Sequence, residues 1–255
     1  MTNKLYNADY LEQTAILFKE LKALSYAPFS ALENGTIADI GCGVGIDAIN
    51  LASLLEENGI KVIGIDSDEL LIQRGIDSNE KTANLEFLTA DTEALPFNDN
   101  SLSGIRNERL IQHLEHPDIA FNEFYRVLQP EAPIVIVETD WTSLSFYNGD
   151  YKLTQKIKEY FPKHIARNSF AAANLSYFLE EHGFKEIGLR LFPIISNSLE
   201  QVISLTKIDY ILEKMKEEGL LAEAEFNDFW RSLQKAGQEQ YFVCSINLIL
   251  ATAFK

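Results

Sequence analysis

Cysteine and histidine are scarce in this chain of 255 residues, which contains two cysteines and four histidines. Cys42 and Cys244 are far apart, so the sequence offers neither a disulfide framework nor a metal-ligand spacing. The histidines are scattered singly and complete no metal site. We therefore predict no metal centre and expect a reducing compartment.

Basic residues are also few, because 22 Lys and Arg stand against 38 Asp and Glu, for a formal net charge of -16. Electrostatic binding of nucleic acid needs clustered basic side chains, so we expect no nucleic-acid partner. No apolar run approaches the roughly 20 residues that span a bilayer, and the N-terminus lacks a signal-peptide pattern. We expect no membrane insertion and a cytoplasmic protein.

What the chain does contain is an alternation of strand and helix patterns. A helical pattern over residues 9–26 ends near Pro28, and predicted strands at 36–40, 61–66, 85–90, 102–105 and 134–139 are separated by helical segments. A helix at 169–182, a strand at 184–192, a helical stretch at 198–236 and a strand at 241–253 follow. The pattern predicts an α/β fold with a doubly wound, mostly parallel, seven-stranded sheet.

Three glycines stand at alternate positions in ADIGCGVG, residues 38–45, directly after the first predicted strand. In a doubly wound sheet, ligands bind beyond the carboxyl ends of the strands, and a glycine turn lets the backbone approach them. Gly41, Gly43 and Gly45 alone could also serve a tight strand-to-helix turn and nothing more.

Polar residues at the next two strand ends favour a ligand. Asp66 ends the second strand, where its carboxylate could accept hydrogen bonds from both hydroxyls of a ribose. Asp91 and Thr92 follow the third strand, where an acid and a hydroxyl could bond the edge of an adenine. Ile46 occupies the place of the third glycine of a dinucleotide motif, which disfavours an NAD-dependent oxidoreductase.

On these residues the sequence resembles the class I S-adenosylmethionine-dependent methyltransferases. ADIGCGVG is similar to their first motif, GIDSDELL to their second, and ADTEALPF and IRNERLIQHLEHPDIAFNEFYRVLQP to later segments. Within the family it is most similar to the branch that includes ubiquinone and menaquinone biosynthesis enzymes. The chain departs from the family at Glu131-Ala132 in a turn and at Ser103-Gly104 before the fourth strand.

The resemblance implies a Rossmann-like methyltransferase fold with an N-terminal helix and a helical insertion before the last strand. We predict one domain over residues 1–255, with an N-terminal helical segment (1–35), a cofactor-binding core (36–140) and a substrate-side segment (141–255). The helical insertion is expected at about 198–238.

The resemblance also implies S-adenosyl-L-methionine as the cofactor and roles for individual residues. Asp39 and the glycine backbone would hold its methionine part, and the backbone at Arg106, just past the fourth strand, would accept from the ammonium group. Gln13 could touch the carboxylate or lie on a solvated helix face. The implied cofactor residues are Gln13, Asp39, Gly41, Cys42, Gly43, Gly45, Asp66, Ser67, Asp91, Thr92 and Arg106.

Residues near the fourth and fifth strand ends are candidates for catalysis and for binding of the substrate. His113 could be a base or a packing residue in a helical stretch, and Glu138 and Asp140 lie at the end of the fifth strand. Trp141 could line the substrate pocket, and Arg167, like Arg106, could hold an anionic substrate group. Nothing in the sequence chooses among these candidates.

The predicted function is methyl transfer from S-adenosylmethionine to a small organic molecule. The alternative is a protein that binds the cofactor but is catalytically inactive and acts through a partner. The sequence leaves open a monomer or a homodimer, the identity of the acceptor, and whether oxygen, nitrogen, sulfur or carbon is methylated.

Overall fold

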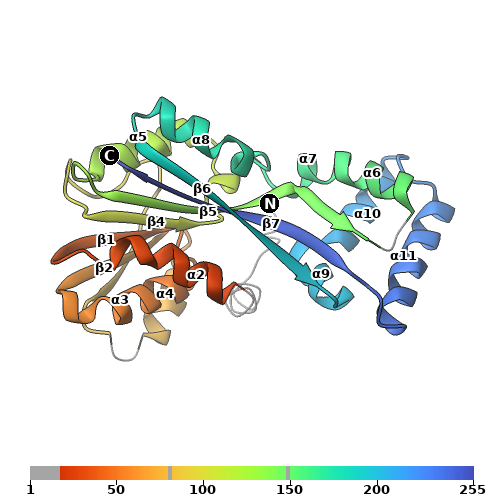
Figure 1. Cartoon of the computed structure of the whole chain (residues 1–255), viewed down its shortest axis with the longest axis horizontal. Helices are drawn as coiled ribbons and strands as arrows, with labels where there is room; N and C mark the ends of the chain where they lie inside the picture. Colours follow the sequence, from red (N-terminus) through yellow and green to blue (C-terminus); the bar gives the residue numbers. More distant parts are fainter. Residues whose placement is uncertain (1–17, 80–81, 148–149) are drawn as a thin grey trace.

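The fold is organised around a seven-stranded sheet with strand order β3-β2-β1-β4-β5-β7-β6. A computed structural model describes residues 18–79, 82–147 and 150–255 (Figure 1). The strands are β1 (Gly35–Ile40), β2 (Ile60–Asp66), β3 (Leu85–Thr89), β4 (Gly104–Glu108), β5 (Pro133–Phe146), β6 (Lys185–Ser196) and β7 (Cys244–Phe254).

Strands β1 to β5 run parallel to their neighbours, and β7 runs antiparallel to both β5 and β6. The predicted doubly wound, mostly parallel sheet is therefore confirmed. The α-helices are α2 (Lys19–Tyr26), α3 (Ile46–Leu54), α4 (Glu69–Ser78), α5 (Pro117–Val127), α6 (Tyr151–Tyr160), α7 (Pro162–Ile165), α8 (Ala171–Glu181), α9 (Leu199–Thr206), α10 (Ile208–Glu217) and α11 (Glu223–Gln238).

The two faces of the sheet bury separate apolar clusters. On β5, Ile134 and Ile136 belong to the cluster that α5 and α8 cover, whereas Val135 and Val137 belong to the cluster that α2 and α3 cover. All four side chains are fully buried. A continuous apolar run such as IVIV is expected in a parallel strand covered on both faces.

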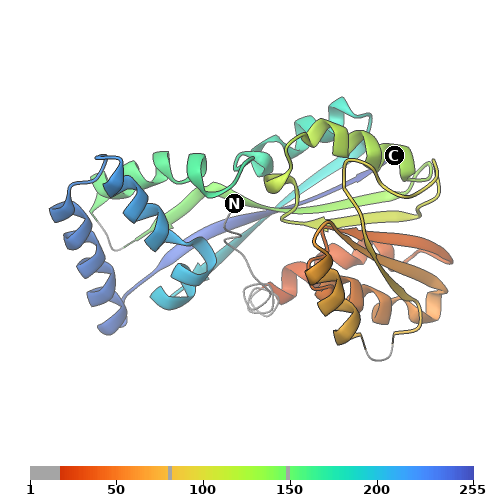
Figure 2. The ribbon, with the colours of Figure 1, turned by 180° about the vertical axis from the view of Figure 1, so that it is seen from behind.

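The sheet continues beyond its parallel part as a three-stranded extension. Strand β5 pairs with β4 only as far as Val137 but runs on to Phe146, about 30 Å at roughly 3.3 Å per residue. The extension of β5, β6 and β7 carries α6, α7, α9, α10 and α11, which pack around a third apolar cluster. We call this part the second lobe; Figures 1 and 2 show it beside the parallel part of the sheet.

Several sequence-based boundaries were wrong. Strand β4 covers residues 104–108 rather than 102–105, and Leu102 makes only an isolated bridge to Leu128. The predicted helical stretch 198–236 is three helices, and the sequence reading missed α6 and α7 altogether. Asp150 accepts a hydrogen bond from Leu153 N at the start of α6, a capping signal that could have revealed this helix.

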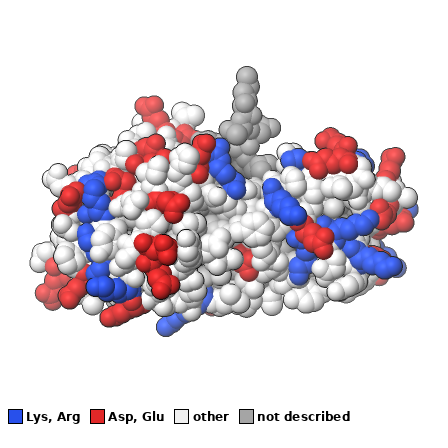
Figure 3. All heavy atoms as spheres, turned by 90° about the horizontal axis from the view of Figure 1, so that it is seen from above, with Lys and Arg blue, Asp and Glu red and all other residues white. Residues whose placement is uncertain are grey.

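Charged side chains of both signs are intermixed on the face seen from above in Figure 3, over both ends of the molecule, with fewer of them in between. This face presents no extended basic surface. Within the described ranges, no helix is both long enough and apolar enough to cross a bilayer.

Candidate functional site

The turn between β1 and α3 is built from three glycines in left-handed backbone conformation. Gly41, Gly43 and Gly45 have φ values of +73°, +57° and +78°. A Cβ atom on Gly41 would lie 2.8 Å from Leu110, and one on Gly45 would lie 2.4 Å from the Phe87 ring. Conformation therefore requires glycine at all three positions and space requires it at Gly41 and Gly45, and the turn lines a hollow.

Asp66, the last residue of β2, is tied to this turn. Its Oδ2 accepts a hydrogen bond of 2.9 Å from the backbone N–H of Gly43, and its Oδ1 accepts one of 2.9 Å from Asp68 N. These bonds fix the carboxylate beside the glycine turn. Ser67, next in the chain, is exposed.

The third strand end lies next to the second, because β3 pairs with β2 in parallel register, Asp66 opposite Thr89. Asp91, two residues farther on, is exposed, and its Oδ1 accepts from Glu93 N at 2.9 Å. Thr92 is buried. The sheet order thus brings the ends of β1, β2 and β3 together along one edge, as the sequence predicts.

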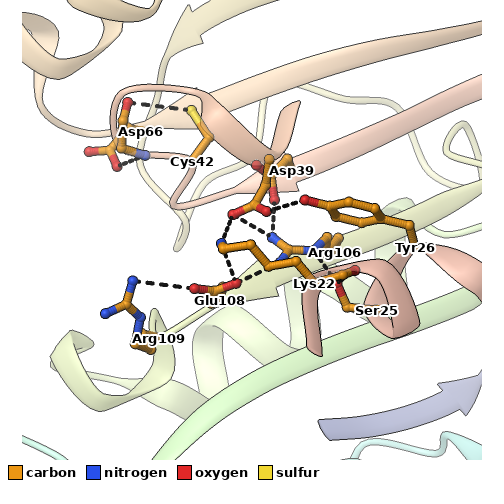
Figure 4. A network of polar contacts seen from close by, with 11 residues as sticks. Lys22, Ser25, Tyr26, Asp39, Cys42, Asp66, Arg106, Glu108 and Arg109 are labelled. Carbon is orange, nitrogen blue, oxygen red and sulfur yellow. Dashed lines mark hydrogen bonds and ion pairs between the residues drawn. The ribbon is translucent and has the colours of Figure 1, made fainter. Parts of the chain in front are cut away.

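On the other side of β1, Arg106 is the centre of a buried ion network (Figure 4). Its side chain is 1% exposed, and its Nη1 lies 3.1 Å from Asp39 Oδ1 and 3.3 Å from Asp47 Oδ2. Its Nη2 lies 2.7 Å from Glu108 Oε2, and its Nε donates to Ser25 Oγ at 2.9 Å. Every donor nitrogen of this guanidinium is therefore engaged.

Helix α2 supplies three residues of the network from one face. Lys22 Nζ lies 2.6 Å from Asp47 Oδ2 and 2.8 Å from Glu108 Oε2, and the Tyr26 hydroxyl donates to Asp47 Oδ1. Lys22, Ser25 and Tyr26 are spaced by three and four residues, so they share a helix face. Polar contacts, together with apolar ones, hold α2 against α3 and β4.

The network balances its charges, since Lys22, Arg106 and Arg109 face Asp39, Asp47 and Glu108. Burial raises the pKa of Asp39 to about 7, an effect that Arg106 partly offsets. Burial alone would raise the pKa of Glu108, but Lys22, Arg106 and Arg109 together hold it well below its usual range. Glu108 is therefore charged at neutral pH.

A hollow opens between this network and the glycine turn. Asp39 Oδ2, which is buried, has no hydrogen-bond partner among the described residues, although Asp39 lines the hollow. A buried carboxylate oxygen of this kind suits a cationic group. The lining residues are Lys22, Asp39, Gly41, Cys42, Gly43, Val44, Ile46, Asp47, Arg106, Glu108 and Arg109.

The structure corrects the position of Arg106. We expected it just past the fourth strand, but it lies inside β4, opposite Asp39 on β1 and Val135 on β5. The misplacement arose because the pattern IRNE resembles a loop, whereas its charges are buried through ion pairs. The proposed roles of Arg106 toward cofactor and substrate stay predictions.

The residues at the predicted end of the fifth strand likewise lie well inside a strand, because β5 runs to Phe146. Glu138 is fully buried, and its Oε1 accepts from Ile111 N at 2.6 Å. Burial raises the pKa of Glu138 to about 8, although its hydrogen bonds from Ile111 and Gln112 oppose this. Asp140 is half-buried, and its Oδ1 accepts from Thr142 N at 3.1 Å.

His113 lies in a short 3-10 helix, η3 (Ile111–His113), rather than in the longer helix that the sequence suggested. Gln112, which the sequence reading missed, links it to Trp141. The Trp141 Nε1–H donates to Gln112 Oε1 at 2.6 Å, and Gln112 Nε2 lies 3.2 Å from His113 Nε2. Trp141 is 3% exposed and its ring packs against Phe161 in the second lobe.

Two predicted residues remain, one on the surface and one that the structure does not describe. Arg167 is exposed and pairs with the exposed Glu115 at 2.7 Å. Gln13 lies outside the described residues. Lys22, Tyr26, Asp47 and Glu108 were missed, and their polar positions within otherwise apolar patterns were the only available signal.

Comparison with known proteins agrees with this geometry. Residues 38–136 match a family model described as a methyltransferase domain. Demethylmenaquinone methyltransferase of Staphylococcus aureus is 27% identical over 177 residues, covering 63% of this chain and 73% of that protein. An uncharacterized 37.1 kDa protein in transposon Tn4556 of Streptomyces fradiae is 29% identical over 177 residues, covering 69% of this chain but only about half, 51%, of that protein.

A solved structure shares the fold. Phosphoethanolamine N-methyltransferase 2 of Haemonchus contortus, in complex with S-adenosyl-L-methionine, superposes with a TM-score of 0.60 at 19% identity. The match covers 99% of this chain and 58% of that one. At this level of identity the likeness concerns the fold.

Proposed function

We propose, from the membership of this chain in the class I S-adenosylmethionine-dependent methyltransferases, that it moves a methyl group to a small organic molecule by in-line displacement. The observation that carries the proposal is the meeting of three strand ends at one edge of the sheet. The glycine turn after β1, Asp66 at the end of β2 and the pair Asp91-Thr92 after β3 are adjacent there.

The residues present fit the cofactor. Bound there, S-adenosylmethionine would supply a methyl group activated by a positively charged sulfur. In the proposal Asp66 holds the ribose hydroxyls, Thr92 and Asp91 the adenine edge, and the glycine turn and Asp39 the methionine part. Asp39 Oδ2, which has no partner in the described part of the chain, and the missing side chains at Gly41 and Gly45 support this assignment.

The rest of the chain contributes position and exclusion of water. Because β1 to β3 are assigned to the nucleoside, the acceptor would approach over the ends of β4 and β5, where η3 lies. The second lobe extends from β5 beyond that edge and could cover the acceptor. Alignment and desolvation are the main contributions available to a protein in such a displacement.

The identity of the acceptor is left open by this proposal. We infer a small molecule because one relative is named demethylmenaquinone methyltransferase, and demethylmenaquinone is a small molecule. The net charge of -16 and the free cysteines Cys42 and Cys244 support an acceptor other than nucleic acid and a cytoplasmic location. A monomer and a homodimer are both compatible with the proposal.

Calorimetric titration with S-adenosylmethionine, with S-adenosylhomocysteine and with NAD tests the cofactor. We expect micromolar binding of the first two, about 8 kcal/mol at 1 μM, and none of NAD. The absence of heat and of thermal stabilisation at millimolar S-adenosylmethionine would refute the proposal.

Turnover is a separate test. Formation of S-adenosylhomocysteine in the presence of defined phenols, enols, amines and thiols should identify the reacting class. Binding without turnover across all four classes would favour the alternative, an inactive cofactor-binding protein.

A further inference from the structure

The orientation of the Gln112 side-chain amide is fixed from two sides. An indole N–H is only a donor, so the Gln112 atom 2.6 Å from Trp141 Nε1 must be the oxygen. The carbonyl of Arg109 is only an acceptor, so the Gln112 atom 3.2 Å from it must be the nitrogen. Both contacts require the same orientation.

This orientation determines the state of the neighbouring histidine. Gln112 Nε2 carries two hydrogens, of which one points to the Arg109 carbonyl and the other to His113 Nε2, 3.2 Å away. Because an amide NH₂ cannot accept, His113 Nε2 must be the acceptor and carry no proton. A neutral imidazole then carries its proton on Nδ1.

The framework around η3 is rigid enough to hold this arrangement. The buried Glu138 on β5 accepts a hydrogen bond from the backbone N–H of Ile111 and a longer one, of 3.4 Å, from the backbone N–H of Gln112. From the turn before α8, Asn168 N donates to the Gln112 carbonyl at 2.8 Å. Gln112 itself is buried, so its amide has little room to turn without losing these contacts.

The charges around η3 also favour a neutral ring. Arg109 lies at the start of the segment, Glu138 is buried beneath it, and the surface pair Arg167–Glu115 lies near its end. Although His113 is exposed at its edge, desolvation of the ring by the packed residues around it, and then the positive charge of Arg109, lower the pKa of His113 to about 4. His113 is therefore neutral at pH 7, as the hydrogen-bond geometry requires.

We propose that Trp141 and Gln112 are positioning residues that hold His113 as the neutral tautomer protonated at Nδ1. In this state Nε2 is occupied as the acceptor from Gln112, so toward a substrate the ring has the chemistry of a hydrogen-bond donor through Nδ1 rather than of a base that removes a proton through Nε2. Its role would be to orient an oxygen or nitrogen acceptor on the substrate. Only this last step rests on the proposed function.

Nitrogen NMR of the imidazole rings tests the tautomer without cofactor or substrate. The chain has only four histidines, and His113→Gln identifies the signal of His113 by its loss. His164 and His182 provide internal references, because the Nδ1 of each lies within hydrogen-bond distance of a backbone carbonyl, at 2.9 Å and 2.7 Å, and must carry the proton. We expect the same Nδ1–H pattern for His113 from pH 7 down to pH 5.

Two variants test how the tautomer is held. Gln112→Glu places a carboxylate beside Nε2, so we expect His113 to gain a proton there and its titration midpoint to rise by at least one pH unit. Trp141→Phe keeps an aromatic ring but removes the indole N–H, so only the Arg109 carbonyl still selects the orientation of the amide. We then expect a mixture of tautomers and a midpoint nearer the ordinary value of about 6.5.

The references His164 and His182 report whether each variant is folded, since their Nδ1–H signals should not change. A wild-type His113 protonated at Nε2, or one that titrates near the ordinary value, would overturn the proposal. A Trp141→Phe spectrum identical to that of the wild type would overturn the part assigned to Trp141. Failure to find turnover would count against the proposed function and leave the NMR result intact.

With an acceptor in hand, the pH dependence of kcat/KM separates the two roles of His113. If His113 is a donor through Nδ1, the wild-type profile should show no ionisation of His113 between pH 5 and 8. The profile of Gln112→Glu should show one in that range. A fall of wild-type kcat/KM toward acid pH, with a midpoint at the pKa of a free histidine, would show that His113 acts as a base. It would contradict the proposal.

Discussion

The carboxylate of Asp66 accepts a hydrogen bond of 2.9 Å from the backbone N–H of Gly43, 23 residues earlier in the chain. This bond joins the end of β2 to the glycine turn after β1. One side chain thus shapes the turn and, in the proposed function, also holds the ribose. Its removal should affect the binding of the cofactor more than the stability of the fold.

Replacement of Asp66 tests this pairing. For Asp66→Ala we expect a loss of about 2 to 3 kcal/mol in the free energy of S-adenosylmethionine binding, roughly a 30- to 150-fold rise in Kd, because bonds to a charged group are lost. Asp66→Asn, which keeps one acceptor oxygen, should lie between. Calorimetry measures both.

The control is Asp68→Ala, which removes the side-chain cap of α4 at Leu70 N. It should lower the free energy of unfolding by about 1 kcal/mol and leave Kd unchanged. Equal affinity of Asp66→Ala and the wild type would place the ribose elsewhere.

Gly45→Ala tests the need for glycine in the turn. The left-handed conformation costs about 1 to 2 kcal/mol for alanine, and contact of the new Cβ with Phe87 adds about 1 to 3 kcal/mol. Gly219, with a φ of +72° and no atom within 4 Å of an added Cβ, is the matched control. Urea unfolding should show that Gly45→Ala loses more than Gly219→Ala; equal losses would contradict the packing argument.

Arg106→Met tests the buried ion network. Removal of Arg106 leaves the buried Asp39 without its ion-pair partner and takes one of three cations from Glu108, which should cost about 3 to 5 kcal/mol in the free energy of unfolding. The exposed pair of Arg167 with Glu115 offers the control, since Arg167→Met should cost at most about 1 kcal/mol. If both variants unfold at the same urea concentration as the wild type, the network does not stabilise the fold.

The raised pKa of Glu138 predicts that the free energy of unfolding depends on pH. Its pKa of about 8 in the folded chain exceeds the ordinary value of 4.5, so between these pH values the unfolded chain has released a proton that the folded chain retains. The contribution of Glu138 to stability is therefore full below pH 4.5 and falls by about 1.4 kcal/mol per pH unit up to pH 8.

Glu138→Gln removes this titration while keeping an oxygen that can accept from Ile111 N. The difference in the free energy of unfolding between variant and wild type should then shift in favour of the variant between pH 5 and 8. Urea unfolding at both pH values measures it. A difference that stays constant with pH would show that the folded and unfolded chains titrate alike at this position.

The alternation of strands and helices, the glycine turn and the acidic residue at the end of β2 could all be predicted from the sequence. Each depends on local properties: apolar runs of four to six residues identify strands that are buried on both faces, and glycine at alternate positions marks a turn that needs left-handed conformation. Parallel strands joined by helices then bring Asp66, Asp91 and the turn to one edge of the sheet.

The ion network and the second lobe depended on the tertiary structure. Arg106 and Glu108 look like loop residues in the sequence, and only pairing with Asp39 and Lys22, 67 and 86 residues away respectively, makes them part of a buried strand. Likewise, nothing local shows that β5 continues to Phe146, because its far half is buried by helices that follow later in the chain. Charge partners and covering helices are long-range contacts, so a local pattern cannot specify them.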